Sequence, residues 1–512
     1  NYVGALQQGE LPQQLDRCII WVKAEASEAS SPSLKQDLPP RFSGTPYQMT
    51  ATADARQGHS WQQQASWRHI WAISWPVLLA NITFPLVGAA DTAMMGRLED
   101  ASFVGGVALG SLVFNFIYFG LGFLRMGTTG LVAQAHGRGD ATAIEHHMVR
   151  GLVLAFCLGT GFVLATPLVL VLTGVMLAAS PAVEALMQQY VGIRLLAVPA
   201  AFANMVLLGC LFGRQHMRLV LVQIIFINVT NLALNILFVL GLGMAIEGVA
   251  LASVAAQWTG LVLTLVLIRW HWRDLLAGIA RRVFLIRPAW FDPAAFQRFF
   301  VIGSDIMIRT VLILLSEAVL LNNAATIGDL SLATAQLVLV MFSLISFGLD
   351  GYAHAAEALV GEAIGRRNLT MLDQVVRRTN ILAGISALLI SILAWAGGPL
   401  IIATLTSQAD LAAMTLAHWH WVALLAPVAF MAFQMDGIFI GATRSREMRN
   451  AMILAFAGFL LAVLVAGGYG LNGLLAAFTI YLGLRGITLM MRMRHVRAMA
   501  MPDDNTARND TT

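Results

Sequence analysis

Charged residues are scarce in this sequence. Only 12% of its 512 residues are Asp, Glu, Lys or Arg, and 58% are hydrophobic. Soluble domains carry about twice that share of charge, so the composition excludes an ordinary soluble globular protein. Apolar runs of about 18 or more residues recur from about residue 70 to residue 492, and each is long enough to cross a bilayer as a helix. We therefore predict an all-α polytopic membrane protein.

Cysteine is also scarce and provides no cross-link or metal motif. Cys18, Cys157 and Cys210 lie far apart, so they form neither a disulfide framework nor a paired-cysteine metal site. The adjacent histidines of "EHHMVR" (145–150) have poor spacing for a shared metal ion. No Ser/His/Asp or Cys/His constellation stands out, and the Gly-x-Gly pairs follow no strand. We expect no enzymatic activity, no metal and no cofactor.

The N-terminal part has a different composition. Lysine occurs only at Lys23 and Lys35, both before the first methionine, Met49. This part is rich in Gln, Ser, Ala and Pro, and its one apolar run, "CIIWV", is too short for a span or a signal-peptide core. We predict that residues 1–65 are a disordered N-terminal extension and that residues 496–512 are a disordered C-terminal tail. We also expect that the start of translation has been assigned too early, upstream of Met49.

Twelve candidate spans are present, and the charges of their loops predict an orientation. Arginines gather in the loops after even-numbered spans, whereas Arg97 is the one clear case after an odd-numbered span. By the positive-inside rule, we expect both termini in the cytoplasm of a bacterial inner-membrane protein. The net charge of +4 therefore follows from topology and is no signal for nucleic acid. The predicted spans are 70–96, 103–129, 148–174, 190–213, 218–242, 246–268, 297–324, 331–361, 379–404, 414–441, 449–468 and 471–491.

The chain repeats itself at an offset of 228 residues. "AHGRGDATAIEHHMVR" (135–150) aligns with "AIGRRNLTMLDQVVRR" (363–378), and "GCLFG" (209–213) aligns with "GIFIG" (437–441). Each repeat holds six spans, so both copies have the same membrane orientation. We predict 12 transmembrane helices in two pseudo-symmetric six-helix lobes around a midplane cavity. The predicted units are an N-lobe at 66–268, a cytoplasmic linker at 269–298 and a C-lobe at 299–495.

Motifs in both halves point to one transporter family. The first half contains "AADTAMMGRL" (89–98), "AHGRGD" (135–140) and "RLLAVPAAFANMVLLGCLFGRQ" (194–215). The second half contains "DIMIRTVLILL", "FGLDGYAHAAEALVGEAIGRRN" and "MDGIFIGATRSREMRNAM". Over about residues 66–495 the chain resembles the multidrug and toxic compound extrusion (MATE) transporters, and its second half resembles the DNA-damage-inducible protein F branch of that family.

This resemblance implies export of cationic, amphiphilic compounds, driven by an inward flow of H⁺ or Na⁺. The family's acid in the first span corresponds to Asp91. The family's N-x-x-x-D pair in the fifth span corresponds to "NLALN", where Asn231 keeps the first position and Asn235 replaces the acid. A hydroxyl of the sixth span corresponds to Ser253. Because Asn235 replaces the acid, one candidate ion site is lost and Asp91 becomes the main candidate for ion coupling. The incomplete set of carboxylates favours H⁺ over Na⁺ as the coupling ion.

Asp91 is an acid inside an apolar segment. A buried carboxylate must find a partner or become protonated, and a proton carrier needs such a group. Pro76 and Pro85 interrupt the hydrogen bonding of the same helix, so we expect this helix to bend. The alternative is that Asp91 lies near the outer end of its span and is solvated.

A substrate cavity is expected beside Asp91. Methionine side chains are adaptable and suit a wall that accepts many apolar shapes. Amides on the fifth and sixth spans either complete a hydrogen-bond network around the acid or hold helices together. The predicted cavity residues are Met94, Met95, Met126, Asn228 and Gln257.

The C-lobe has a charged set of its own. Asp305 and Arg309 are four apart in the seventh span, and Asp350, His354 and Glu357 share one face of the eighth. Their depths permit ion pairs between Arg309 and Asp350 and between Asp305 and His354. The set is either a network that pins the lobe or a second proton or substrate site, in which His354 can switch near neutral pH.

The leading interpretation is a monomeric H⁺-coupled exporter of small cationic amphiphiles, with the ion gradient as its only energy source. The alternative is a flippase for lipids or lipid-linked precursors, which needs several unpaired arginines in its cavity to hold pyrophosphate. A structural or receptor-like membrane protein has no need of buried acids in both lobes. We expect the lipid bilayer and a small molecule as partners, and no nucleic acid.

Overall fold

The structure is a computed structural model that describes residues 61–95, 101–177, 179–272 and 292–502. The side chains of residues 82–95, 101 and 295 lie outside this description. The account below concerns the unit that begins at Trp61. Of the predicted disordered ends, residues 1–60 and 503–512 fall outside the described residues, as does most of the predicted linker. The prediction is wrong for residues 61–64 and 496–499, which are helical.

The described residues are helical, and no strand occurs among them. The helices of the first repeat are α3 (Trp67–Met95), α4 (Ala101–Gly120), α5 (Phe123–Gly137), α6 (Ala141–Leu164), α7 (Thr166–Met176), α8 (Pro181–Arg194), α9 (Val198–Gly213), α10 (Met217–Asn235) and α11 (Ile246–His271). Those of the second are α13 (Pro293–Ile327), α14 (Asp329–Gly365), α15 (Leu369–Leu405), α16 (Ala409–Ala417), α17 (Trp419–Gly441), α18 (Ser445–Ala466), α19 (Gly470–Met490) and α20 (Met493–Met499).

Each of the twelve predicted spans overlaps a helix. Ten helical segments of the described part are long and apolar enough to cross a membrane. The last of them, Ser445–Met499, contains two spans, because α18 and α19 pack against each other on either side of the turn at Gly467–Tyr469. Together with α3, these helices match the predicted number. The all-α polytopic fold is confirmed.

Several spans are broken into two helices. α4 and α5 are separated by two residues that end one helix and begin the next, and α8 is joined to α9 by the 3₁₀ turn Leu195–Ala197. Pro167 and Pro199 occupy the first turns of α7 and α9, where the missing amide proton of proline costs no helical hydrogen bond. The sequence-based ranges treated each of these spans as continuous.

The repeat is visible in the backbone of the turns. Gly139, Gln215, Arg367 and Thr443 all adopt a positive φ, between 51° and 71°. They form two pairs at the 228-residue offset, and each ends the turn after a helix that finishes at a glycine. Asp140 caps α6 by accepting from the amide of Ala143, and Asn368, its repeat mate, caps α15 in the same way. The internal repeat is therefore a repeat of structure.

Glycines let helices cross closely inside each lobe. A Cβ on Gly209 of α9 would lie 2.6 Å from the carbonyl oxygen of Arg125 in α5. The repeat-related contact in the second lobe joins Gly437 of α17 to Ala353 of α14, with 2.2 Å to the carbonyl oxygen. Both distances exclude any side chain larger than hydrogen. The motifs "GCLFG" and "GIFIG" thus mark corresponding helix crossings.

The two lobes meet where α5 crosses α14. A Cβ on Gly137 would lie 2.2 Å from the carbonyl oxygen of Glu362, and one on Gly365 would lie 2.1 Å from that of Gln134. These two contacts are related by the repeat, so the pseudo-two-fold axis passes between them. α3 adds a second connection, because it packs against both α10 and α14.

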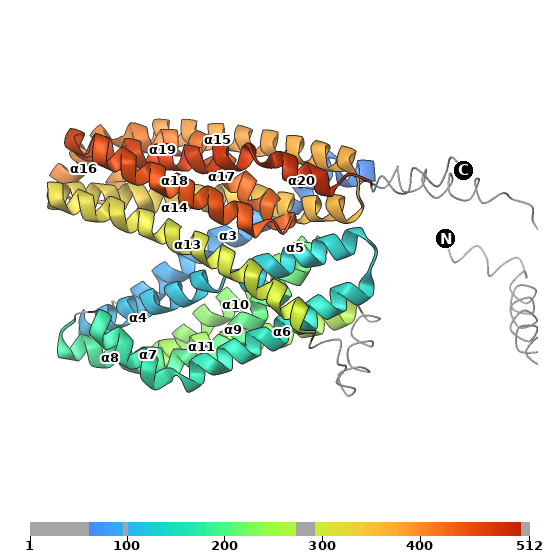
Figure 1. Cartoon of the computed structure of the whole chain (residues 1–512). Helices are drawn as coiled ribbons and strands as arrows, with labels where there is room; N and C mark the ends of the chain where they lie inside the picture. The colour runs from blue at the N-terminus through green and yellow to red at the C-terminus, as the bar shows by residue number, and fades with distance from the viewer. Residues whose placement is uncertain (1–60, 96–100, 178, 273–291, 503–512) are drawn as a thin grey trace, which may run out of the picture. The chain divides into compact units, whose positions relative to one another are not determined.

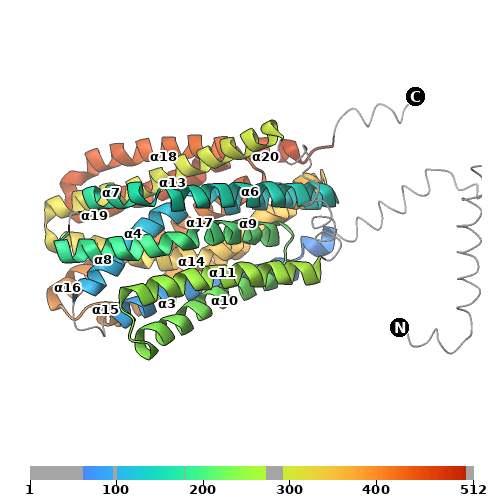
Figure 2. The ribbon, with the colours of Figure 1, turned by 90° about the horizontal axis from the view of Figure 1, so that it is seen from below.

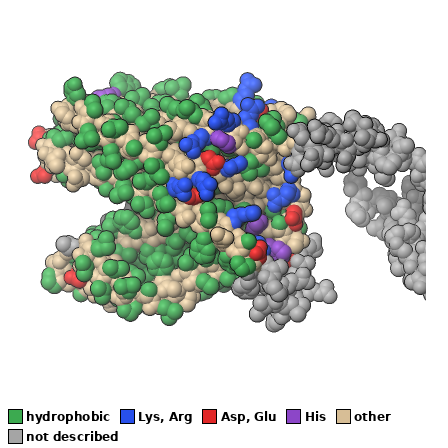
Figure 3. Space-filling model, viewed as in Figure 1, with side chains coloured by type: hydrophobic (Ala, Val, Ile, Leu, Met, Phe, Trp, Pro, Cys, Tyr) green, Lys and Arg blue, Asp and Glu red, His purple; other side chains and the backbone are tan. Residues whose placement is uncertain are grey.

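Within Trp61–Thr512, α14–α19 form one bundle and α4–α11 the other, and α13 crosses from the first to the second (Figure 1). α10 and α11 pack side by side in the N-lobe (Figure 2). Figure 3 shows the surface hollowed between the bundles at one end, whereas Arg side chains gather at the opposite end. The α5–α14 crossing closes this basic end.

Candidate functional site

A polar cluster lies between α10 and α11 in the N-lobe. The Asn231 amide donates to Ser253 Oγ at 3.1 Å, and the Asn235 amide donates to Asn231 Oδ1 at 3.3 Å. All three side chains are buried. The structure therefore brings together the three residues that the sequence placed beside Asp91. These hydrogen bonds pair buried polar groups of two neighbouring helices that water cannot reach.

A second amide group extends this cluster towards α9. Asn204 Nδ2 donates to the backbone oxygen of Gln257 at 2.8 Å and to its Oε1 at 3.0 Å. Gln223 Nε2 donates to the backbone oxygen of Asn204 at 3.3 Å. Asn204 and Gln223 were not expected from the sequence. The signal was available for Asn204, which is the one amide side chain of the apolar α9, whereas Gln223 shares α10 with three asparagines.

The other predicted cavity residues are placed only in part. Asn228 is half-buried on α10, one turn before Asn231. Met126 is half-buried on α5 and packs against the buried core. Asp91, Met94 and Met95 lie in the last two turns of α3, and their side chains are outside the described residues. Their roles therefore stay predictions.

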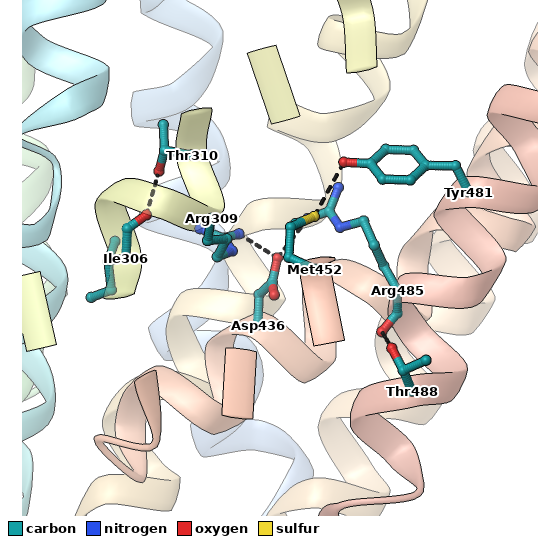
Figure 4. A network of polar contacts seen from close by, with 8 residues as sticks. All are labelled: Ile306, Arg309, Thr310, Asp436, Met452, Tyr481, Arg485 and Thr488. Atoms are coloured by element: carbon teal, nitrogen blue, oxygen red, sulfur yellow. Dashed lines mark hydrogen bonds and ion pairs between the residues drawn. The ribbon is translucent and has the colours of Figure 1, made fainter. Parts of the chain in front are cut away.

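In the C-lobe, Asp436 joins two buried arginines. Arg309 of α13 donates to Asp436 Oδ2, and Arg485 of α19 donates to the same oxygen at 2.7 Å (Figure 4). The Nε atoms of both arginines are buried without a hydrogen-bond partner among the described residues. Close by, Tyr481 donates to the sulfur of Met452 at 3.3 Å. One carboxylate of α17 thus links α13 to α19.

Asp305 has different partners from those predicted. Arg449 Nη1 donates to Asp305 Oδ1 at 2.6 Å, and Ser445 Oγ donates to Oδ2 at 2.9 Å. Both partners come from α18. The predicted ion pairs Arg309–Asp350 and Asp305–His354 are therefore wrong. The depth estimate compared α13 with α14 alone, whereas α13 turns these side chains towards α17, α18 and α19.

A further ion pair connects the lobes. Arg125 Nη1 of α5 lies 3.4 Å from Glu357 Oε2 of α14, and His354 Nδ1 lies 3.2 Å from the same oxygen. Phe212 of α9 contacts both side chains, with its ring 4.9 Å from that of His354 and 5.4 Å from the Arg125 guanidinium carbon. Asp350, one turn earlier on α14, interacts electrostatically with His354 and Arg125. Of the predicted C-lobe set, His354, Glu357 and Asp350 thus form one group.

Near the basic end, polar side chains reinforce the α5–α14 crossing. Glu362 of α14 accepts from Gln215 Nε2 at 2.5 Å and from Arg366 Nε at 2.8 Å. His69 Nε2, in the first turn of α3, lies 3.2 Å from Gln215 Oε1. Gln134 donates to the backbone oxygen of Gly441 at 3.0 Å. The turn after α9 therefore joins α3 to α14 at this end, and Gln134 of α5 adds a contact to α17.

Comparison with known proteins identifies the family. The MatE family model matches residues 76–237 and 306–467. DNA damage-inducible protein F of Escherichia coli (strain K12) is 36% identical over 423 residues, which cover 82% of this chain and 90% of that protein. The chain belongs to the MatE family. The two matched ranges fall one in each repeat, in agreement with the internal repeat.

More distant members and solved structures agree with this assignment. The probable multidrug resistance protein NorM of Rhizobium meliloti is 26% identical over 472 residues, covering 88% of this chain and 98% of that protein. A crystal structure of MATE in the bent conformation superposes with a TM-score of 0.76 at 18% identity, covering 86% of this chain and 98% of that one. The structure of a MOP superfamily transporter from Pyrococcus furiosus superposes with a TM-score of 0.74 at 18% identity, covering 85% of this chain and 96% of that one.

The resemblance that the motifs indicated is confirmed. This MatE chain is an integral membrane transporter of the multidrug and toxin efflux type, built as two lobes. Its N-lobe contains the amide and hydroxyl cluster on α10 and α11. Its C-lobe contains the paired charges around Asp436 and Asp305.

Proposed function

We propose that this MatE chain is a secondary active exporter that exchanges cationic amphiphilic compounds for H⁺ by alternating access of its two lobes. Relatives in the family are named as multidrug resistance proteins, which supports a broad set of small-molecule substrates. The predicted inner-membrane location, cytoplasmic termini and monomeric state belong to this proposal.

The observation that carries the proposal is the composition of the N-lobe cluster. Among the described residues, the cluster on α9, α10 and α11 consists of amides and one hydroxyl and contains no carboxylate. A site that exchanges a proton for a cation needs an acid. Asp91 lies on α3, which packs against α10, and it is the acid that we assign to this task.

In this mechanism, ionised Asp91 attracts the cation and protonated Asp91 releases it. Because the lobes are closed at the basic end and hollowed at the other, a cation released here leaves on the side away from the basic loops. The amides of Asn231 and Asn235 can donate to the ionised carboxylate and release it when it is protonated.

Coupling to H⁺ is favoured over coupling to Na⁺ by the residue at the end of α10. Asn235, which stands where the family pattern has an acid, donates its amide to Asn231. A sodium site at this pair therefore lacks the negative charge that a carboxylate brings to a hard cation.

The test is export of ethidium or rhodamine 6G from proteoliposomes, under a pH gradient or a Na⁺ gradient imposed separately. We expect the pH gradient alone to drive export by the wild type, and Asp91→Asn to abolish it. Asp410→Asn, the same change at an exposed acid of α16, serves as the control and should export normally. Export by Asp91→Asn at the wild-type rate would remove Asp91 from the mechanism, and Na⁺-driven export would change the ion.

The flippase alternative is disfavoured by the pairing of arginines. Arg125 is bound to Glu357, and Arg309 and Arg485 share Asp436, so acids already neutralise the arginines that would hold pyrophosphate. Protection from thermal unfolding by a lipid-linked pyrophosphate, with no protection by cationic dyes, would reverse this ranking.

A further inference from the structure

A basic pocket opens on the surface between α3 and α15. It has a volume of about 330 Å³ and is lined by Trp67, Gln374, Arg377, Arg378 and Ile381. A second pocket of about 270 Å³ adjoins it, because Gln374 and Arg377 line both. Neither pocket belongs to the N-lobe cluster or to the C-lobe charge pairs.

The positive charge of the pocket is not neutralised. No acid of the described residues forms an ion pair with Arg377 or Arg378. Arg378 is held in place instead by the backbone oxygen of Ala65, which accepts from its Nη1 at 2.6 Å, and by the Trp67 ring, 5.7 Å from its guanidinium carbon. Asp373, which lines the second pocket, is already bound by Arg497 at 2.7 Å. The pocket therefore presents two guanidinium groups that no described acid neutralises.

Apolar side chains continue from the pocket along both helices. On α3, Trp71 follows Trp67 by one turn and is 50% exposed. On α15, Ile385 follows Ile381 by one turn and is 61% exposed. These two apolar lines run away from the basic end, in the direction in which the hydrocarbon of a bilayer would begin. A tryptophan beside arginines at this level is typical of the membrane interface.

An anion that fits both features has a phosphate head and acyl chains. Arginine binds phosphate oxygens through paired N–H donors, and basic pockets between helices on the cytoplasmic side suit anionic headgroups. We propose that the pocket binds the phosphate of an anionic phospholipid, whose acyl chains lie along Trp71 and Ile385.

The position of the pocket gives the lipid a role in the transport cycle. α15 belongs to the C-lobe bundle, whereas α3 packs against α10 of the N-lobe as well as α14. A lipid that contacts both α3 and α15 therefore joins the C-lobe bundle to a helix that also packs on the N-lobe. Bound lipid stabilises the arrangement in which this end is closed.

The binding test is thermal unfolding of the full-length detergent-purified protein, titrated with phosphatidylglycerol, phosphatidylcholine or inorganic phosphate. We expect only phosphatidylglycerol to raise the melting temperature saturably. The double change Arg377→Gln with Arg378→Gln should weaken its apparent affinity about tenfold, since two phosphate contacts are lost. Arg269→Gln with Arg446→Gln removes the same charge from two exposed arginines and should leave the affinity unchanged.

Each of the other results is decisive. Equal protection by phosphatidylcholine, or an unchanged affinity in the double variant, would overturn the proposal. If inorganic phosphate protects the protein equally well, the ligand of the pocket is a soluble anion and the lipid proposal is wrong. If the double variant does not fold, Arg377→Gln alone gives the same test, because Arg377 is exposed and donates to no described residue.

The conformational role needs a second measurement. Spin labels at Val175 of α7 and Leu464 of α18, both exposed, report the separation of the lobes after Cys18 and Cys157 are replaced by serine. Phosphatidylglycerol should enrich one distance population in nanodiscs, and the Arg377→Gln, Arg378→Gln protein should not respond. An identical response of both proteins would show that the lipid acts elsewhere.

Discussion

At the scale of single residues, Asp436 is the acid on which two buried arginines depend. Removal of one partner from a buried charge pair leaves the other charge uncompensated, which typically costs about 3 kcal/mol or more. We expect Asp436→Asn to lower the free energy of unfolding by about that amount, because Arg309 and Arg485 both lose the negative charge that compensates them. Thermal or SDS-induced unfolding of the purified protein measures the change.

The control for this change is Asp410→Asn, which alters an exposed acid at the start of α16. It should cost little, since exposed charges contribute little to stability. If Asp436→Asn and Asp410→Asn unfold alike, the Asp436 pairs do not stabilise the lobe, and a role of Asp436 in transport becomes the better explanation for its burial.

The residue scale is also where sequence reasoning was weakest. The types of the charged residues of α13 and α14 were sufficient to predict that they lie inside the lobe. The partners of these residues could not be predicted in the same way. The depth of a residue along its helix does not determine the direction in which its side chain points around the helix axis. Arg309 and Asp305 each turn towards a different neighbour, and those neighbours, Asp436 and Arg449, lie more than a hundred residues further along the chain.

At the scale of elements, the turns after α9 and α17 show what a repeat can predict. Gln215 and Thr443 share a positive φ because the two copies end their helices in the same way. The offset of 228 residues was therefore a sound guide to corresponding turns. Neither the offset nor the hydropathy predicted the interruptions inside the spans, such as the one between α4 and α5. A break of two residues does not change the mean hydropathy of a span.

One of these turns makes stability depend on pH. Burial, with help from the nearby Arg214, lowers the pKa of His216 to about 4. Its Nε2 accepts from the Trp272 indole at 3.1 Å, which requires the neutral imidazole. Because the unfolded chain takes up this proton near pH 6.5, the contribution of His216 is complete above that pH and is lost as the pH falls towards 4.

We expect His216→Gln to reduce this loss by about 1 kcal/mol, a value discounted for the partial exposure of His216. Melting temperatures between pH 7.5 and pH 5 measure it, because the wild type should lose more stability than the variant over that range. His495→Gln, at an exposed histidine of α20, should follow the wild type. Parallel curves for all three proteins would show that His216 does not titrate differently on folding.

At the scale of the whole molecule, the two-lobe architecture could be predicted and its closed end could not. Because each repeat holds an even number of spans, the two lobes have the same membrane orientation. The meeting of Gly137 with Gly365 depends on how the lobes lean on each other, and neither glycine differs in sequence from many others in the chain. The close approach of α5 to α14 is therefore a property that only coordinates reveal.

Alanine at this crossing should push the lobes apart at the basic end. In Gly365→Ala the new Cβ would lie 2.1 Å from the carbonyl oxygen of Gln134, and in Gly137→Ala it would lie 2.2 Å from that of Glu362. Overpacking of this kind costs about 1–3 kcal/mol, so the closed arrangement should lose about tenfold or more in population. The same Val175–Leu464 spin-label distances measure the shift, and dye export should fall with it.

Gly161→Ala is the matched control, because a Cβ on Gly161 of α6 meets nothing within 4 Å. This change should leave the distances and export as they are. If Gly365→Ala and Gly161→Ala give the same distance distribution, the helices at the α5–α14 crossing accommodate the added methyl group without moving the lobes. The closed end would then depend on the side-chain contacts of Glu362 and Gln215, and Glu362→Gln rather than the glycine change would open it.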